Sequence, residues 1–163
     1  MRNRVADFYR QNEWANLALI EACRALSEEQ LDVTAVGTYG SIRETLRHIV
    51  SSEGGYAHRL GTEPTRRLQR DDPWPGLDEL GEMVSANADA LAAAAEGEPD
   101  RVVRVGSDAE PYDVEAAVIL IQAFNHSTEH RSQINTILTT LGIEPAELSG
   151  WEWGLATDRM RRA

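Results

Sequence analysis

Two histidines stand four residues apart in the stretch FNHSTEHRSQI, residues 124–134. If this stretch is helical, His126 and His130 project from adjacent turns about 5–6 Å apart, so their ring nitrogens can converge on one metal ion. The same spacing also occurs where a buried histidine only hydrogen-bonds a backbone carbonyl or a carboxylate. The pair alone therefore leaves a metal site and a buried polar network both open.

A third histidine would complete a site suited to chemistry, because three protein ligands leave one position for water or substrate. His48, in the stretch LRHIV, is the candidate, and the small Thr45 and Ser52 on its side of a helix leave room for an ion. Three neutral imidazoles leave a divalent ion its full charge, so a water or a thiol in the remaining position loses its proton near neutral pH. The residues do not decide between the two.

Hydrophobic periodicity predicts the elements that must position these histidines. Helices are expected over residues 3–26, 41–60, 77–96 and 114–141. A small β-hairpin is expected over residues 101–114, turning at Gly106-Ser107-Asp108. Residues 61–76, with three prolines, are expected to form a connection, and the tail after Pro145 an irregular segment or short helix. The chain is long enough for one domain over residues 1–163, and its fold class is all-α.

Both histidines of the pair fall on the inward stripe of the last helix. That stripe consists of Ile119, Ala123, His126, His130, Ile134, Ile137 and Leu141. The corresponding stripe of the first helix is expected to be Phe8, Ala15, Leu19, Ala22 and Leu26. Apolar residues above and below the two histidines indicate that both rings face the protein interior.

The second helix carries one charged residue, Glu53, on an otherwise apolar stripe. Glu53 is the candidate catalytic residue, either as a carboxylate that orients a ligand imidazole or as a general base. The alternative is a helix-edge residue paired with an arginine. Gly54 and Gly55 follow it, and each costs a helix about 1 kcal/mol relative to alanine, which favours close packing or a local kink at this point.

Composition excludes several partners. The formal charge is −11, so the surface should repel a phosphate backbone, and no nucleic acid is expected. No stretch reaches the length of a membrane span and the first residues lack the apolar core of a signal peptide, so a cytoplasmic protein with no membrane partner is expected. The lone Cys23 cannot form an internal disulfide and is expected to be a packed structural thiol.

The stretches LRHIV and NHSTEHRSQI, with the closing Leu141-Gly142, resemble the DinB and YfiT-like family of metalloproteins. The family pattern has one histidine in the second helix and an HxxxHR-x-Q motif in the fourth, and the order of elements is similar over nearly the whole chain. The resemblance implies that His48, His126 and His130 are the metal ligands. It makes Arg131 and Gln133 motif residues of unsettled role, and Ser132 stands where the family often has glycine.

The same resemblance implies an up-down four-helix bundle, commonly a homodimer, that binds zinc, nickel or a similar divalent ion. Superfamily members include thiol-dependent transferases and isomerases that use bacillithiol or mycothiol. The expected function is therefore a metal-dependent thiol S-transferase or hydrolase acting on a small molecule, with a low-molecular-weight thiol as a possible second cofactor. The alternative is a non-catalytic, dimeric ligand-binding or stress-associated protein with a structural metal or none.

Overall fold

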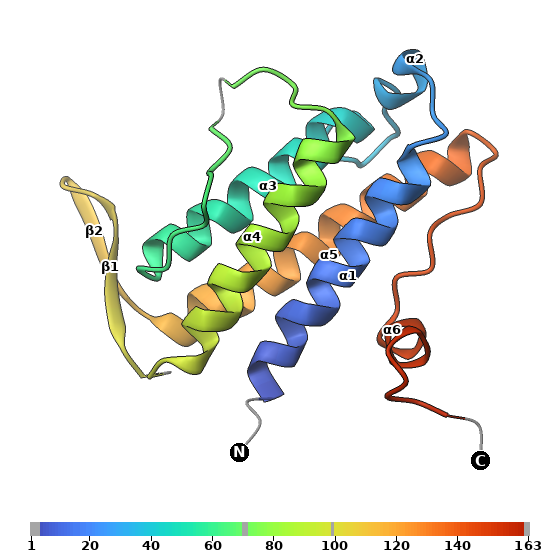
Figure 1. The fold of residues 1–163 in the computed structure, drawn as a ribbon. Coiled ribbons are helices and arrows are strands. Elements are labelled where there is room, and N and C mark those ends of the chain that lie inside the picture. Colours follow the sequence, from blue (N-terminus) through green and yellow to red (C-terminus); the bar gives the residue numbers. More distant parts are fainter. Residues whose placement is uncertain (1–3, 70–71, 99, 162–163) are drawn as a thin grey trace.

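Four long helices form a bundle in the computed structural model, which describes residues 4–69, 72–98 and 100–161 (Figure 1). The helices are α1 (Arg4–Cys23), α3 (Ile42–Arg59), α4 (Leu77–Glu96) and α5 (Ala116–Thr140). Helix α1 packs against α4 and α5, and α3 packs against the same two partners. All four predicted helices are confirmed, with ends that differ from the predicted ones by up to three residues.

Capping boxes start two of the helices. The Ser41 side chain accepts a hydrogen bond from the backbone of Glu44 while the Glu44 carboxylate accepts one from the backbone of Ser41, which fixes the start of α3. Ser27 and Gln30 do the same for the one-turn helix α2 (Glu28–Leu31). These reciprocal bonds satisfy backbone groups that a helix start leaves without partners.

The connection between α3 and α4 runs back along α3. The carbonyl of Asp72 accepts a hydrogen bond from Arg47, near the start of α3, whereas Arg67 lies over Gly54, further along the same helix. Helix α4 therefore begins at the same end of the bundle as α3, and the two run parallel (Figure 1). The directions of the four helices consequently do not alternate strictly, although the bundle itself is as predicted.

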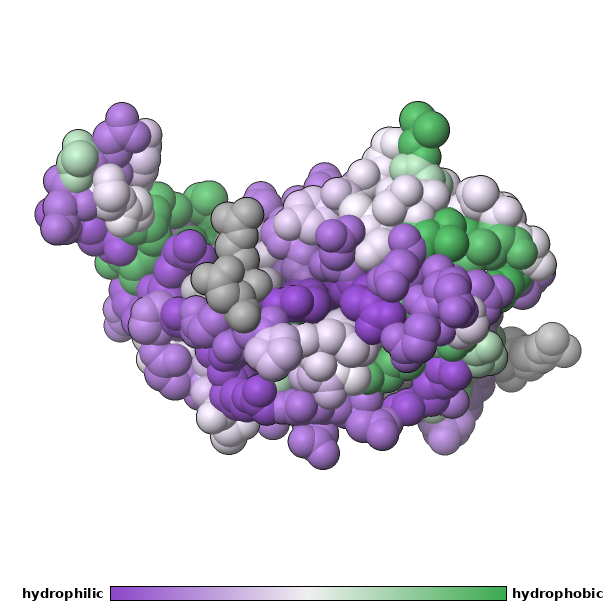
Figure 2. All heavy atoms as spheres, turned by 90° about the horizontal axis from the view of Figure 1, so that it is seen from above, coloured by the Kyte–Doolittle hydropathy of each residue, from purple (hydrophilic) through white to green (hydrophobic). Residues whose placement is uncertain are grey.

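A two-stranded hairpin precedes α5 and projects from the body of the bundle (Figure 2). Strands β1 (Val102–Ser107) and β2 (Glu110–Glu115) pair antiparallel. The turn was expected to include Gly106, but Gly106 belongs to β1 and pairs with Pro111, so the turn lies at residues 108–109. Gly106 has a φ of +96°, and a Cβ there would collide with the carbonyl oxygen of Glu110, so only glycine fits this place in the strand.

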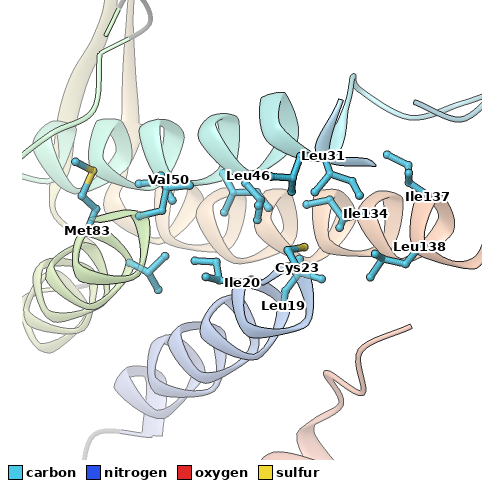
Figure 3. Close-up of a cluster of buried hydrophobic side chains, with 14 of the residues drawn as sticks. Leu19, Ile20, Cys23, Leu31, Leu46, Val50, Met83, Ile134, Ile137 and Leu138 are labelled. Atoms are coloured by element: carbon cyan, nitrogen blue, oxygen red, sulfur yellow. The ribbon is translucent and has the colours of Figure 1, made fainter. Parts of the chain in front are cut away.

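The main core lies where the four helices meet (Figure 3). It contains Leu19, Ile20 and Cys23 of α1, Leu31 of α2, Leu46 and Val50 of α3, Met83 of α4, and Ile134, Ile137 and Leu138 of α5. Burial raises the pKa of the Cys23 thiol to about 12, as expected of a packed thiol rather than a nucleophile. Among the described helices, none has both the length and the apolar character that crossing a membrane requires.

The inward face of α1 differs from its predicted stripe. Phe8 is 55% exposed, whereas its neighbour Tyr9 is buried and donates a hydrogen bond of 2.8 Å to the carbonyl of Leu120. The amide side chains of Asn12 and Asn16 are also buried on this face. The prediction for Phe8 is therefore wrong, because the buried face of α1 is partly polar and an apolar pattern does not reveal it.

Candidate metal centre

The three predicted ligands lie together at the middle of the bundle. His48 comes from α3, and His126 and His130 come from adjacent turns of α5. Their ring centroids are 4.4 to 4.7 Å apart, and the nitrogens that they offer all lie within 4.8 Å of one another. Nε2 of His126 lies 2.9 Å from Nε2 of His48. A tetrahedral ion at normal nitrogen distances needs ligand separations of about 3.4 Å, so the rings fit an ion after small shifts.

Gln133 fixes the orientation and tautomer of His130. Its Oε1 lies 2.9 Å from Nδ1 of His130 and accepts a hydrogen bond of 3.1 Å from the backbone N–H of Tyr39. Because that N–H can only donate, the shared atom must be the amide oxygen, and Nδ1 of His130 must carry the proton. The lone pair of Nε2 is then available to an ion. This contact gives Gln133 the role that its sequence motif left unsettled.

His126 lacks a conventional partner for either ring nitrogen. Its Nδ1 is buried and has no hydrogen-bond partner among the described residues, while its Nε2 faces another imidazole. Burial, with smaller contributions from His130 and His48, lowers the pKa of His126 to about 4. Burial and His130 also lower the pKa of His48. Both rings are therefore neutral at physiological pH, the form in which imidazole binds zinc, nickel or similar ions.

Two tyrosines restrict the rings. Tyr39 stacks on His48 with centroids 4.1 Å apart and planes 11° apart, and its edge meets His130 at 5.2 Å. Tyr56 meets His126 edge to face at 5.8 Å. Tyr39 was not foreseen, because it lies in the irregular segment before α3, where hydrophobic periodicity has no meaning. Together they limit how far the ligand rings can rotate.

A pocket of about 680 Å³ opens at His48. Its lining is about equally polar and apolar and consists of Tyr39, Glu44, Arg47, His48, Ser51, Leu68 and Gln69. Helix α3 supplies most of these side chains and the connection after it supplies the last two. A small molecule in this pocket would therefore contact one of the three candidate ligands directly.

Glu53 is buried beside the histidines but does not contact them. Its Oε1 accepts hydrogen bonds from Asn12 at 2.6 Å, Asn16 at 2.9 Å and Ser127 at 2.6 Å. Among its hydrogen bonds in the described residues, none involves a ligand histidine. Glu53 is 1% exposed, so the helix-edge position of the alternative is wrong, although its expected arginine neighbour is present as Arg131. Through Ser127 it instead holds the turn of α5 between the two histidines of the pair.

Arg131 completes a buried polar network around Glu53. Its Nη1 donates to Oδ1 of Asn12 at 2.5 Å and of Asn16 at 2.8 Å, so the two amides bridge the guanidinium and the carboxylate. Burial raises the pKa of Glu53, against the effects of its hydrogen bonds and of Arg131. Burial lowers the pKa of Arg131 to about 10, which still leaves it charged at neutral pH. The network joins α1, α3 and α5 behind the candidate metal centre.

Comparison with known proteins bears on the fold and the family of the chain. A crystal structure of a DinB-like protein from Bacillus cereus ATCC 10987 superposes with a TM-score of 0.68 at 12% sequence identity, covering 88% of this chain and 94% of that one. At that identity the similarity concerns the fold. No curated protein sequence matches the chain. The sequence model of the DinB family matches residues 1–155, and the chain therefore belongs to the DinB family.

Proposed function

We propose that the protein is a metal-dependent enzyme that holds one divalent ion on His48, His126 and His130 and transfers a thiol to a small electrophilic molecule. The observation that carries this proposal is the convergence of three imidazoles beside an open pocket, with no carboxylate or thiol of the described residues joining the cluster. Three ligands and a free position are typical of catalytic rather than structural zinc sites.

The ion, zinc or nickel, would supply positive charge that lowers the pKa of a thiol or water in the free position. The protein's own residues supply the orientation. Gln133 holds the proton of His130 on Nδ1, and Tyr39 keeps the ring of His48 in place. Of the two roles raised for Glu53, we propose the orienting one, because its hydrogen bonds hold the α5 turn at Ser127.

The pocket has room for the two reactants of a thiol transfer. Its volume of about 680 Å³ admits a low-molecular-weight thiol together with a small acceptor. In the proposed reaction the thiol loses its proton to solvent and its sulfur bonds to the electrophilic carbon, while the bond from that carbon to its leaving group breaks. The leaving group departs with the electron pair of that bond and takes up a proton from solvent. Hydrolysis of the same acceptor is the second candidate, with water as the nucleophile.

The proposal is tested by following thiol consumption and acceptor loss with metal-loaded protein, chelated protein and His126→Ala. Metal-dependent loss of both compounds supports thiol transfer, and loss of the acceptor alone supports hydrolysis. If metal-loaded protein consumes neither compound, and chelation lowers the melting temperature sharply, the ion is structural and the non-catalytic alternative holds.

We also propose a homodimer. Several large apolar side chains are exposed on α1, α5 and the short C-terminal helix α6 (Gly150–Ala156). They are Val5, Phe8, Val118, Ile121, Trp151 and Leu155. Sedimentation equilibrium tests this assembly, and a monomer at micromolar concentration would contradict it.

A further inference from the structure

The tandem glycines of α3 make space for two arginine side chains. A Cβ at Gly54 would lie 2.9 Å from Cγ of Arg67, and a Cβ at Gly55 would lie 3.3 Å from Nη1 of Arg59. Glycine weakens a helix interior, so its presence at two successive positions needs a compensating use. In the structure the two glycines leave a shallow notch on α3, and the side chains of Arg59 and Arg67 lie against it.

This notch adjoins the pocket at the candidate metal centre. It belongs to a hollow of about 270 Å³ lined by Ser51, Gly55, His58, Arg59, Arg67, Leu68 and Gln69. Ser51, Leu68 and Gln69 also line the pocket at His48, so the two hollows are continuous. Gly54 follows His48 by six residues, which is about 9 Å along a helix.

The two arginines lack acidic partners within the described part of the chain. Other arginines are paired: Arg66, next in sequence to Arg67, contacts Glu79, and Arg43 contacts Glu28 and Asp32. Arg59 makes only a distant contact, 5.8 Å from the ring of Tyr56. Both arginines line the hollow beside the candidate centre, in a chain of net charge −11.

The remaining charged groups of the two hollows are already engaged. The carboxylate of Glu44 caps the start of α3, and Arg47 donates to the carbonyl of Asp72. His58 contacts Glu63. Glu63 places one carboxylate beside His58, and the two guanidinium groups of Arg59 and Arg67 outnumber it at this end of the cleft. Guanidinium groups bind carboxylates through paired, charge-assisted hydrogen bonds.

We propose that Arg59 and Arg67 bind a carboxylate of the substrate, so that the enzyme acts on small organic anions whose reacting end lies at the candidate metal centre. This inference rests on the proposed function, because the ion on His48, His126 and His130 marks where the reacting end sits. It adds the substrate class and two specificity-determining residues. The tandem glycines keep the notch open for both arginine side chains.

The test uses two hydroxamates of equal length as probes of the metal-loaded protein. Adipic acid monohydroxamate carries a carboxylate at its far end, and its methyl ester is the neutral match. The acid should bind wild-type protein about 5-fold to 20-fold more tightly than the ester, and added salt should reduce that preference. In the double variant Arg59→Gln, Arg67→Gln the preference should fall below about 2-fold, with ester affinity and metal content unchanged. Arg66→Gln, which removes a neighbouring paired arginine, should keep the preference.

Equal binding of the two probes to metal-loaded wild-type protein would overturn the inference, as would a preference that survives in the double variant or disappears equally in Arg66→Gln. A second experiment without metal distinguishes failure of the carboxylate site from failure of the proposed metal-dependent function. Adipate is titrated into chelated wild-type protein and into the double variant. Arginine-dependent adipate binding, in a protein that retains no ion and does not bind the ester hydroxamate, would sink the proposed function and leave the anion site standing. Absence of adipate binding in that case would overturn both.

Discussion

Removing one charge from the Glu53 and Arg131 network should destabilise the fold strongly. Glu53 is 1% exposed and Arg131 is 4% exposed, so either charge left alone would be buried without compensation. Breaking a buried pair by changing one partner costs about 3–5 kcal/mol. For a chain of this size that corresponds to a melting temperature lowered by about 6–20 °C.

The two suitable single variants are Glu53→Gln and Arg131→Met, which keep side-chain volume nearly constant. Each should lower the free energy of unfolding by about 3–5 kcal/mol, while the double variant should lose at least about 2 kcal/mol less than the sum of the two, because neither charge is then left alone. The double variant should lose less than the sum because the two charges compensate each other across Asn12 and Asn16, which hydrogen-bond to both.

Urea denaturation followed by circular dichroism gives these free energies. The measurement uses chelated protein, because an ion that binds only the folded state would add its own stabilisation. Asp89→Asn, which removes an exposed partner of Arg10, is the matched control and should change stability by less than about 1 kcal/mol. Single variants within about 1 kcal/mol of wild type, or strictly additive losses, would refute the reasoning.

Three further predictions concern single residues. Gln133→Leu should weaken metal binding about 10-fold to 100-fold with the fold retained, as competition with a chelating dye would measure; an unchanged affinity would exclude Gln133 from orienting His130. Gly55→Ala should raise the free energy of unfolding by up to about 1 kcal/mol, since only the flexible end of an arginine must move. Gly54→Ala should gain less stability or lose some, because its Cβ would meet Cγ of Arg67. Urea denaturation that ranks the two variants in the opposite order would contradict this prediction. Cys23 should resist a thiol reagent at pH 8 until the protein is unfolded, so rapid labelling of native protein would show that its burial is incomplete.

The sequence was informative where a pattern repeats along a helix. The 3.6-residue period predicted the four helices, and the steps of the last stripe placed His126 and His130 on one face. The third ligand, His48, followed from the resemblance and from its place near the apolar stripe of α3. The common direction of α3 and α4 could not be predicted, because periodicity carries no direction and the contacts of Arg47 with Asp72 and of Gly54 with Arg67 are long-range.

The polar residues of the interior were the part of the structure that the sequence predicted least well. Asn12 and Asn16 are amides on a helix, a residue type found mostly at the surface, and nothing local indicates that they face Glu53. Glu53 itself was visible as a charge on an apolar stripe, but its partners come from α1 and α5. The tandem glycines signalled close packing, which the structure confirms at Gly54, yet the packed side chain, Arg67, lies in a segment without periodicity.

Metal content is the measurement that tests the central claim most directly. Tag-free protein, purified without chelator and dialysed against mixed divalent metals, is analysed for bound elements beside His48→Ala, His126→Ala and His130→Ala, with the exposed His58→Ala as control. We expect about one ion per wild-type and control chain, and loss of the ion in each of the three ligand variants while circular dichroism shows the helices intact. Wild-type protein without an ion, or ligand variants that keep one, would contradict a metal centre on these three histidines.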